Sequence, residues 1–452
     1  MSYLNFKIQV QLQKTSQRRC EYVILKKQIT LEEQKGKFMT TIIEKQINES
    51  SSREIKLNGF IGIKVEKDKS FSVGKNIVKK LITISKSNIV VDGSNATIYV
   101  EICDNLGIDT ALFYINNETK NICFKNMKIH IYIANSCNTV DKFFAIYNTA
   151  SNVYFQNCII DLQCINQMNL YGIYNYGIID LDMLKNANNL SISDCNINVI
   201  CSAKSFTKDC SVYGIYNHLA NSISVQNTYV NTINDGIGEN QKSIGIFTSG
   251  RFGRFTGNNI KANSSHTTGT EKEKGSSFGF INRGDYSIIT SNNILGEWAG
   301  IAIGIENDAE YAKISSNKIL ATHTICGRCI RNYKNKNTFN DNILTSTSRN
   351  ARLIETHGSD CIITNNYLEV LMPHENCTTG CGIYIEGSSR NHIVKNNIIN
   401  NIKNCGIFAP SVSLITDNIC VSASPRFSPN EKTTNLKFKK ILDEKNIKSI
   451  HN

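Results

Sequence analysis

Four ionisable residues, each directly after a short apolar segment, are the strongest candidates for chemistry in this chain. They are Glu306 in Ile305-Glu-Asn-Asp308, Arg331 in Ile330-Arg-Asn332, Glu355 in Leu353-Ile-Glu-Thr-His357 and Glu386 in Tyr384-Ile-Glu-Gly387. Successive members lie 25, 24 and 31 residues apart. This spacing predicts that they occupy equivalent positions on consecutive turns of a repeating structure.

Carboxyl groups in such a column would suit glycosidic chemistry. Side chains on neighbouring turns of stacked strands lie about 5 Å apart, and those two turns apart lie about 10 Å apart. Glycosidases place their two carboxyl groups about 5 Å apart when they retain configuration and up to about 9.5 Å apart when they invert it. We therefore predict Glu355, Glu386 and Glu306 as catalytic residues, with Glu355 and Glu386 as acid and as nucleophile or base.

The predicted substrate-binding residues are Arg331, His357, Tyr384 and Asn282. Arg331 would hold an anionic or hydroxyl-rich group, and His357 would assist proton transfer. The alternative is a surface row of Glu and Arg that only forms salt bridges between strands. A register error of one residue would turn any of these side chains inward.

The elements that must position these residues are indicated by a recurring Asn or Asp, which follows a β-prone run and precedes an aliphatic residue. Its spacing, mostly 21 to 38 residues, is typical of a repeat architecture. Asn tolerates left-handed corners, and stacked amides can hydrogen-bond along a ladder. The predicted ladder, with Cys195 in a degenerate place, is Asn126, Asn157, Asn227, Asn258, Asn292, Asn317, Asp341, Asn365, Asn396 and Asp417.

A second signature, a small residue followed by an apolar pair, lies about ten residues before most ladder positions, as in Gly214-Ile-Tyr and Gly382-Ile-Tyr. Together the two patterns predict an all-β solenoid of short parallel strands. Over residues 55–425 the sequence resembles the single-stranded, right-handed parallel β-helix of the pectate-lyase-like superfamily. The expected fold has about 11–13 coils, with short helical caps at its ends.

The expected organisation is one elongated domain with distinct ends. Residues 1–38 are a basic leader that need not belong to the native protein, 39–54 an N-terminal cap, 55–429 the β-helix and 430–452 a basic helical tail. Ile42, Ile43 and Ile47 predict an amphipathic helix in the N-terminal cap, which would cover the first coil.

Family motifs narrow the function only in part. The paired Asp motifs of polygalacturonases and the acidic calcium cluster of pectate lyases are absent, and Met372-Pro-His-Glu375 departs from the Asp-Pro-His-Glu of mannuronan epimerases. Glu306-Asn307, Leu353-Ile-Glu355 and Gly382-Ile-Tyr384 resemble inulin fructotransferases, which are trimeric. That resemblance implies a carbohydrate-active enzyme and a homotrimer. The competing class is a non-catalytic, tailspike-like or surface glycan-binding scaffold.

Two other groups of residues have an ordinary structural interpretation. Tyr147, Tyr174, Tyr216, Phe247 and Phe280 predict an aromatic stack in the interior or at a turn, with a sugar-binding platform as the alternative. Cys326-Gly-Arg-Cys329 has metal-ligand spacing, but its partner pair Cys377 and Cys381 would lie about 10 Å away. We expect neither a metal nor any cofactor.

Composition limits the partners. The net charge of +12 comes from the two ends of the chain, and residues 81–429 are balanced, so a nucleic-acid partner is not expected. Mean hydropathy is −0.24 and no apolar run approaches 18 residues, which excludes an integral membrane protein. Sixteen cysteines behind an N-terminus without an apolar signal segment predict reduced thiols and a cytoplasmic location. A poly- or oligosaccharide is the expected partner.

Overall fold

The computed structural model describes most of the solenoid. Its described residues are 36–65, 78–103, 109–134, 142–165, 168–177, 189–202, 209–236, 241–264, 275–297, 300–322, 325–348, 350–371, 380–402, 405–409, 413–421, 428–429 and 437–438. The predicted leader before residue 36, the Met372-Pro-His-Glu375 segment and most of the predicted tail lie outside them. Among the described residues no helix is long and apolar enough to cross a membrane.

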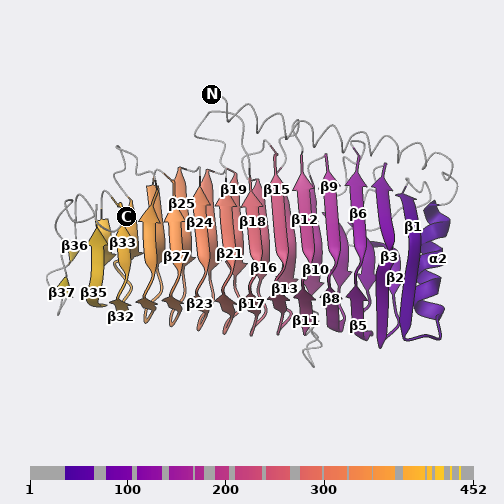
Figure 1. Cartoon of the computed structure of the whole chain (residues 1–452), viewed down its shortest axis with the longest axis horizontal. Helices are drawn as coiled ribbons and strands as arrows, with labels where there is room; N and C mark the ends of the chain where they lie inside the picture. Colours follow the sequence, from indigo (N-terminus) through magenta and orange to yellow (C-terminus); the bar gives the residue numbers. More distant parts are fainter. Residues whose placement is uncertain are drawn as a thin grey trace, which may run out of the picture.

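The chain winds into one long stack of parallel strands, with strands from successive coils side by side along its axis (Figure 1). One face of the stack is a thirteen-stranded parallel sheet. Its strands, in spatial order, are β2 (Lys79–Ile84), β4 (Thr110–Ile115), β7 (Lys142–Asn148), β10 (Asn169–Tyr176), β13 (Ser211–His218), β16 (Lys242–Thr248), β19 (Ser276–Asn282), β22 (Ile301–Asn307), β25 (Cys326–Asn332), β28 (Asn350–Thr356), β31 (Cys381–Ile385), β34 (Cys405–Ala409) and β36 (Ser428–Pro429).

The remaining strands form a second parallel sheet of twenty-four strands in two rows. The first row contains β5 (Lys120–Lys125), β8 (Ser151–Gln156), β11 (Leu190–Ser193), β14 (Ser224–Gln226), β17 (Arg254–Thr256), β20 (Ile288–Thr290), β23 (Lys313–Ser315), β26 (Thr338–Asn340), β29 (Ile362–Thr364) and β32 (His392–Lys395). The second row contains β6 (Lys128–Ile133), β9 (Ile159–Cys164), β12 (Asn196–Cys201), β15 (Tyr229–Asn234), β18 (Asn259–Asn263), β21 (Asn293–Glu297), β24 (Lys318–Thr322), β27 (Ile343–Ser346), β30 (Tyr367–Val370) and β33 (Ile398–Asn400). The long strands β1 (Glu54–Val65), β3 (Ile89–Ile102) and β35 (Ser413–Val421) extend across both rows, and β37 (Lys437–Phe438) pairs with β35.

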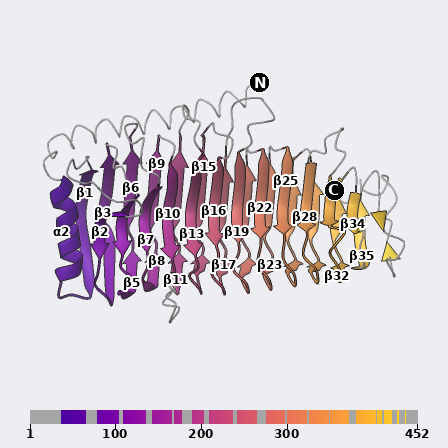
Figure 2. The same cartoon turned by 180° about the vertical axis from the view of Figure 1, so that it is seen from behind.

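Each complete coil therefore contributes three strands, and the fold is the predicted right-handed parallel β-helix. Viewed from behind, the stack keeps the same regular spacing of coils from end to end (Figure 2). Its core consists of rows of identical or similar side chains in register, such as Ile173, Ile215 and Ile246. Stacked β-branched residues suit this arrangement because they pack well on a pleated, buried surface.

On coils such as that of Gly245, the small residue of the second signature is required by close packing inside the coil. A Cβ on Gly245 would lie 2.3 Å from the Ile260 side chain and 2.5 Å from the Gly279 carbonyl oxygen. Pairing in the thirteen-stranded sheet skips this position, as between Ile244↔Phe278 and Ile246↔Phe280. The strand is locally irregular there, so the side chains before and after this position do not follow the regular alternation between the two faces.

The asparagine ladder exists, but the predicted row mixed two adjacent columns. Asn126, Asn157, Asn227, Asp341, Asn365, Asn396 and Asp417 have left-handed backbone angles at a corner. Asn258, Asn292 and Asn317 instead belong to the next position, where the amides are buried and hydrogen-bonded to one another. This inner ladder continues through Asn342, Asn366, Asn397 and Asn418.

The N-terminal end of the stack is covered as expected, by helix α2 (Gly36–Glu49), which lies against β1 in Figure 1. Ile43 and Ile47 are buried there, whereas Ile42 is exposed. At the other end the described residues Lys437 and Phe438 form a short strand where we expected a helix. The rest of that predicted tail lies outside the described residues.

Candidate functional site

The predicted charged column lies on the outer face of the thirteen-stranded sheet. Glu306 pairs in register with Arg331, and Arg331 with Glu355, on the consecutive strands β22, β25 and β28. The next two places in this column are taken by Tyr384 and Phe408. Glu306, Arg331, Glu355 and Tyr384 therefore share one surface row, which we call the first outer column.

Glu386 is not in the first outer column. It lies two residues further along its coil, in a second outer column formed by Arg283, Asp308, Tyr333, His357 and Glu386. The amide of each of these residues donates to the carbonyl at the end of the preceding strand, as Tyr333 does to Asn307 and Glu386 does to Thr356. The two columns flank an inward-facing position, so both project from the same face.

The inward position between the two columns holds Asn282, which we expected to bind substrate. Asn282 is fully buried, and its Nδ2 donates to Asn307 Oδ1 at 2.7 Å. Asn307 donates in the same way to Asn332, so these amides form a second internal ladder. Asn282 is therefore turned away from the outer face and has a structural role in the ladder.

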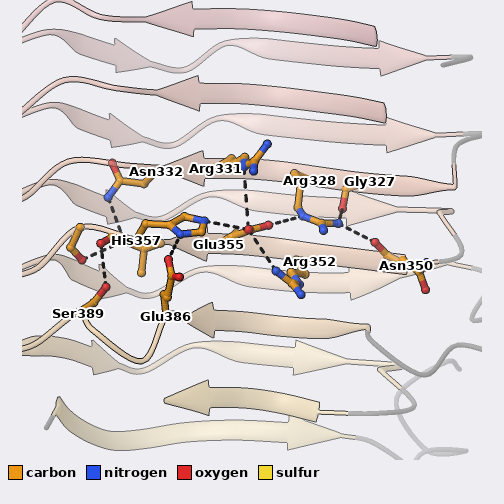
Figure 3. A network of polar contacts seen from close by, with 12 residues as sticks. Gly327, Arg328, Arg331, Asn332, Asn350, Arg352, Glu355, His357, Glu386 and Ser389 are labelled. Atoms are coloured by element: carbon orange, nitrogen blue, oxygen red, sulfur yellow. Dashed lines mark hydrogen bonds and ion pairs between the residues drawn. The ribbon is translucent and has the colours of Figure 1, made fainter. Parts of the chain in front are cut away.

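Glu355 is the most enclosed carboxylate of the site, with only 3% of its surface exposed. Its oxygens contact the Nε of Arg328, the Nη1 of Arg352 at 3.2 Å, the Nε of Arg331 at 4.0 Å and the Nε2 of His357 at 2.9 Å. Figure 3 shows these groups converging on the carboxylate from neighbouring strands. Such a clamped group is unsuited to the role of acid or nucleophile that we predicted for it, because little of it can reach a substrate.

The protonation state of Glu355 agrees with this geometry. Burial raises the pKa of the Glu355 carboxyl group, but the charges of Arg328 and Arg352 outweigh that effect, and the pKa ends below its ordinary value. Glu355 is thus held as a carboxylate. Its place in the site is that of an anchor for the residues around it.

His357 connects this anchor to the surface. One ring nitrogen, Nε2, lies 2.9 Å from Glu355 Oε1, and the other, Nδ1, contacts Glu386 Oε2 (Figure 3). The side chain of Glu386 is 44% exposed, that of His357 24% and that of Glu355 only 4%. Because a neutral imidazole carries one N–H, both contacts can be hydrogen bonds only when one more proton is shared among these three groups.

The turn after β31 holds this arrangement in place. Ser389 Oγ donates to the carbonyl oxygen of His357 at 2.9 Å, which ties the turn after Glu386 to the preceding coil. The His357 ring also stacks on Tyr333, with ring centres 5.3 Å apart. The imidazole is therefore fixed from three sides and has one carboxylate on each nitrogen.

Glu306 has the opposite electrostatic character to Glu355. Burial raises the pKa of the Glu306 carboxyl group, and the nearby Arg331 and Arg283 offset only part of this effect. Glu306 and Glu355 are two coils apart in the same column, which corresponds to about 10 Å along the stack. The two carboxyl groups therefore differ in electrostatic character, because burial favours the protonated form of Glu306 whereas the surrounding arginines hold Glu355 ionised.

Two arginine–aromatic contacts border the site. The guanidinium of Arg331 lies 4.9 Å from the centre of the Tyr333 ring, and that of Arg352 lies 3.9 Å from the centre of the Tyr384 ring. Both contacts lie within the range of a cation–π interaction. Tyr384 is thus placed beside the predicted site, but its ring is partly occupied by Arg352.

Arg328 and Arg352 were missed in the sequence because of the irregularity at the position that many coils fill with a small residue, here Cys329 and Leu353. They lie three residues before Arg331 and Glu355 on the same strands, and residues three apart in a regular strand face opposite sides. In β25 the two residues between the arginines, Cys329 and Ile330, are both buried, so Arg328 and Arg331 both face outward. The only signal in the sequence would have been the paired spacing Arg328, Arg331 and Arg352, Glu355.

The first outer column continues toward the N-terminus as an aromatic row. Tyr114, Tyr147, Tyr174, Tyr216 and Phe247 follow one another in register, with ring centres 4.5 to 5.5 Å apart. These rings lie on the outer face, not in the interior or at a turn as expected. Phe280 is the exception, since it is fully buried and belongs to an interior column.

Metal coordination finds no support among the described residues, where no cluster of three or more His, Cys, Asp or Glu side chains could hold an ion. Cys329 is fully buried and its thiol contacts the Thr345 carbonyl oxygen at 3.0 Å. Burial raises the pKa of this thiol well above its usual range. Cys329 is not part of a disulfide.

No protein-family model and no curated protein matches the chain. Among solved structures it is similar to the Dettilon tailspike protein, with 13% identity, 73% of this chain and 62% of that chain covered, and a TM-score of 0.42. The A-module of the mannuronan C-5 epimerase AlgE6 of Azotobacter vinelandii has 10% identity, with 82% of this chain and 92% of that chain covered and a TM-score of 0.43. DFA-IIIase of Arthrobacter chlorophenolicus in complex with GF2 has 11% identity, with 85% of this chain and 89% of that chain covered and a TM-score of 0.36. The chain thus spans less than two thirds of the tailspike chain.

Proposed function

We propose that this protein is a carbohydrate-active enzyme that cleaves or transfers a glycosidic linkage at the outer face of its thirteen-stranded sheet. The observation that carries the proposal is the position of His357 between the carboxylates of Glu355 and Glu386. A buried carboxylate that orients a histidine, which in turn contacts an accessible group, is the arrangement by which enzymes set up proton transfer.

In this proposal the groups have separate roles. Glu386, the most exposed of the three, exchanges a proton with the substrate or with an attacking water, and His357 accepts or returns that proton. Glu355 touches no substrate and is a positioning residue. Glu306, whose pKa is raised by burial, is the acid that protonates the leaving oxygen.

The spacing of these groups favours water as the attacking species. Glu306 lies two coils from His357 and three coils from Glu386, about 10 and 15 Å along the stack. The second separation is longer than the upper limit of about 9.5 Å for the carboxyl pairs of inverting glycosidases, so a chain of water molecules connects Glu386 to the reacting sugar. A retaining enzyme would need carboxyl groups only about 5 to 5.5 Å apart. We therefore propose inversion, to be read from the anomeric configuration of the first product by proton NMR.

Binding of a glycan is supported by the surface around these residues. Arg331 and Tyr333 lie between Glu306 and His357, and the aromatic row of the first outer column leads toward them along the sheet. The solved structures named above include proteins described as an epimerase of mannuronan and as a tailspike. The proposal rests on the side chains of this chain and not on those similarities.

The test is turnover on a panel containing a fructan, a pectin, a uronate polymer and their oligosaccharides, followed by thin-layer chromatography. Glu386→Gln and Glu306→Gln should each abolish product formation, whereas Glu118→Gln, an exposed carboxyl group in the turn before β5, should not. If both active-site variants kept wild-type rates, the assignment would be wrong. Glycan binding without turnover on any substrate would favour the scaffold alternative.

A further inference from the structure

A second row of aromatic residues lies at the corner that follows the thirteen-stranded sheet. At this corner one residue per coil has a left-handed backbone, and on many coils that residue is asparagine, as at Asn88, Asn121, Asn152, Asn189 and Asn391. On three consecutive coils it is Phe252, Tyr286 or Tyr311, with φ angles of 61°, 60° and 56°. We call these three residues the aromatic corner.

The aromatic corner is an unfavourable choice for folding alone. The left-handed region is tolerated by asparagine, because its short polar side chain can bond locally, but it is strained for bulky side chains. Phe252, Tyr286 and Tyr311 are also 54%, 46% and 42% exposed, so the free energy gained by burying these side chains is small and does not offset this strain. Strained positions that persist at one place in a fold are candidates for function.

The geometry of the three rings suits a flat ligand. Phe252 and Tyr286 have ring centres 5.4 Å apart at 19°, and Tyr286 and Tyr311 have ring centres 4.9 Å apart at 4°. Carbon atoms in contact are about 3.5 to 4.0 Å apart. Nearly parallel rings with these longer centre distances are therefore offset-stacked, with each ring displaced sideways relative to the next. Each ring therefore leaves part of one face uncovered.

Polar groups border the rings on the side of the candidate active site. Arg251, Asp285 and Glu310 directly precede the three aromatic residues, and Arg251 Nε lies 3.9 Å from Asp285 Oδ2. On the next coil Lys336 Nζ donates to the Tyr311 hydroxyl at 2.9 Å. Apolar ring faces beside a line of charged groups match a sugar, which has apolar C–H faces and a polar edge of hydroxyl groups.

The size of the patch argues against a second protein chain as the occupant. At these exposures three rings offer roughly 300 Å², whereas a stable protein interface needs about 800 Å² from each partner. The location points to the substrate, because Tyr286 and Tyr311 each follow a residue of the second outer column, Arg283 and Asp308, by three positions. The aromatic corner is thus a flank of the candidate active site.

We infer that the aromatic corner binds a section of the glycan chain that extends beyond the reacting sugar, with the chain running along the stack. This inference rests on the proposed function for its ligand class. It adds a binding subsite that acts mainly on long glycans, because a short oligosaccharide bound at the reaction site reaches at most the nearest of the three rings.

The test is affinity electrophoresis of the full chain in native gels containing a fructan, a pectin or a uronate polymer. The triple variant Phe252→Asn, Tyr286→Asn, Tyr311→Asn carries the residue that other coils use at this corner, so it should fold normally. The control is Tyr154→Asn with Tyr229→Asn, two strand tyrosines with 44% and 39% exposure. At least one polymer should retard the wild type and the control, and the triple variant should bind it about tenfold more weakly.

Equal retardation of the triple variant and the wild type would overturn the inference, as would a wild type retarded by no polymer. Turnover of a short oligosaccharide, measured in parallel with Glu386→Gln, separates this inference from the proposed function. Turnover that depends on Glu386, together with unchanged retention in the triple variant, would refute the subsite alone. Retention that depends on the aromatic corner, with no turnover, would refute the catalytic assignment alone.

Discussion

Glu306 and Arg331 are paired in register on β22 and β25, and the arginine opposes the rise in pKa that burial imposes on the carboxyl group. The two residues are therefore coupled through charge. The protonated fraction of Glu306 at a given pH depends on whether Arg331 is present.

Replacing Arg331 should move the pH dependence of activity. Without the positive charge the pKa of Glu306 rises further, so an acid that must be protonated stays protonated to higher pH. Arg331→Gln should therefore shift the alkaline limb of the kcat/KM profile to higher pH. Arg254→Gln, which removes an exposed arginine from β17, is the matched control. An unshifted or lowered alkaline limb would contradict the role of Glu306.

Replacing Glu355 should destabilise the fold and also impair activity. Glu355→Gln keeps the shape but leaves Arg328 and Arg352 without their carboxylate, and breaking a buried charge pair costs about 3 kcal/mol. The free energy of unfolding in urea should fall by that amount at neutral pH. Because the pKa of Glu355 is lowered in the folded state, the difference from wild type should shrink as the pH falls through that pKa.

A buried histidine predicts loss of stability in acid. His392 is 1% exposed, neither ring nitrogen has a hydrogen-bond partner among the described residues, and burial lowers its pKa to about 4. Between its ordinary pKa near 6.5 and about 4, the unfolded chain binds a proton that the folded chain does not. Stability should therefore fall by about 1.4 kcal/mol for each unit of pH in that window. Asp360 opposes part of this shift.

The measurement is urea unfolding between pH 7 and 4 for the wild type, His392→Asn and the control Gln226→Asn, which changes an exposed residue of β14 that has no ionisable group. The slope should be shallower in the first variant and unchanged in the second. Equal slopes in all three proteins would show that His392 is not the group responsible.

The inner asparagine ladder should matter more for stability than the corner column beside it. Asn317 is buried, and its Nδ2 donates to Ile289 O at 2.9 Å and to Asn342 Oδ1 at 3.1 Å. Asn317→Ala leaves several buried polar groups unpaired and should cost about 3 kcal/mol. Asn365→Ala, at an exposed corner with φ of 57°, should cost only about 1 kcal/mol. Thermal and urea unfolding of both variants would test the order, and equal losses would contradict it.

Much of the fold was accessible from the sequence, because each coil repeats the same local requirements. Three features recur at similar intervals in the sequence and can be aligned with one another. They are an inward row of β-branched residues, a small residue where the coil is tight and an Asn at the corner. The same repeats placed Glu306, Arg331 and Glu355 in one outer column, which the strand register confirms.

The register within a coil was harder to predict where the sequence offers two similar alignments. Ile385-Glu386 resembles Ile354-Glu355, yet Ile383 is the residue that pairs with Ile354, so Glu386 lies two residues further along. Where two asparagines are adjacent, as in Asn365-Asn366, the sequence likewise does not show which one is at the corner and which one is inside. In the structure Asn365 is at the corner and Asn366 is in the inner ladder. Both ambiguities are resolved by packing, since the inward column accepts only side chains that fit its neighbours.

From residue types and spacing alone, the chain could be assigned as a stacked parallel coil with carboxyl groups and an arginine along one flank. The chemical character of those groups depended on contacts between residues far apart in sequence. Arg328 and Arg352 reach Glu355 because the strand pairing is irregular at Cys329 and Leu353, and that enclosure makes Glu355 an anchor and leaves Glu386 accessible. Burial and charge in three dimensions set the pKa of each group, and no repeat pattern encodes them directly.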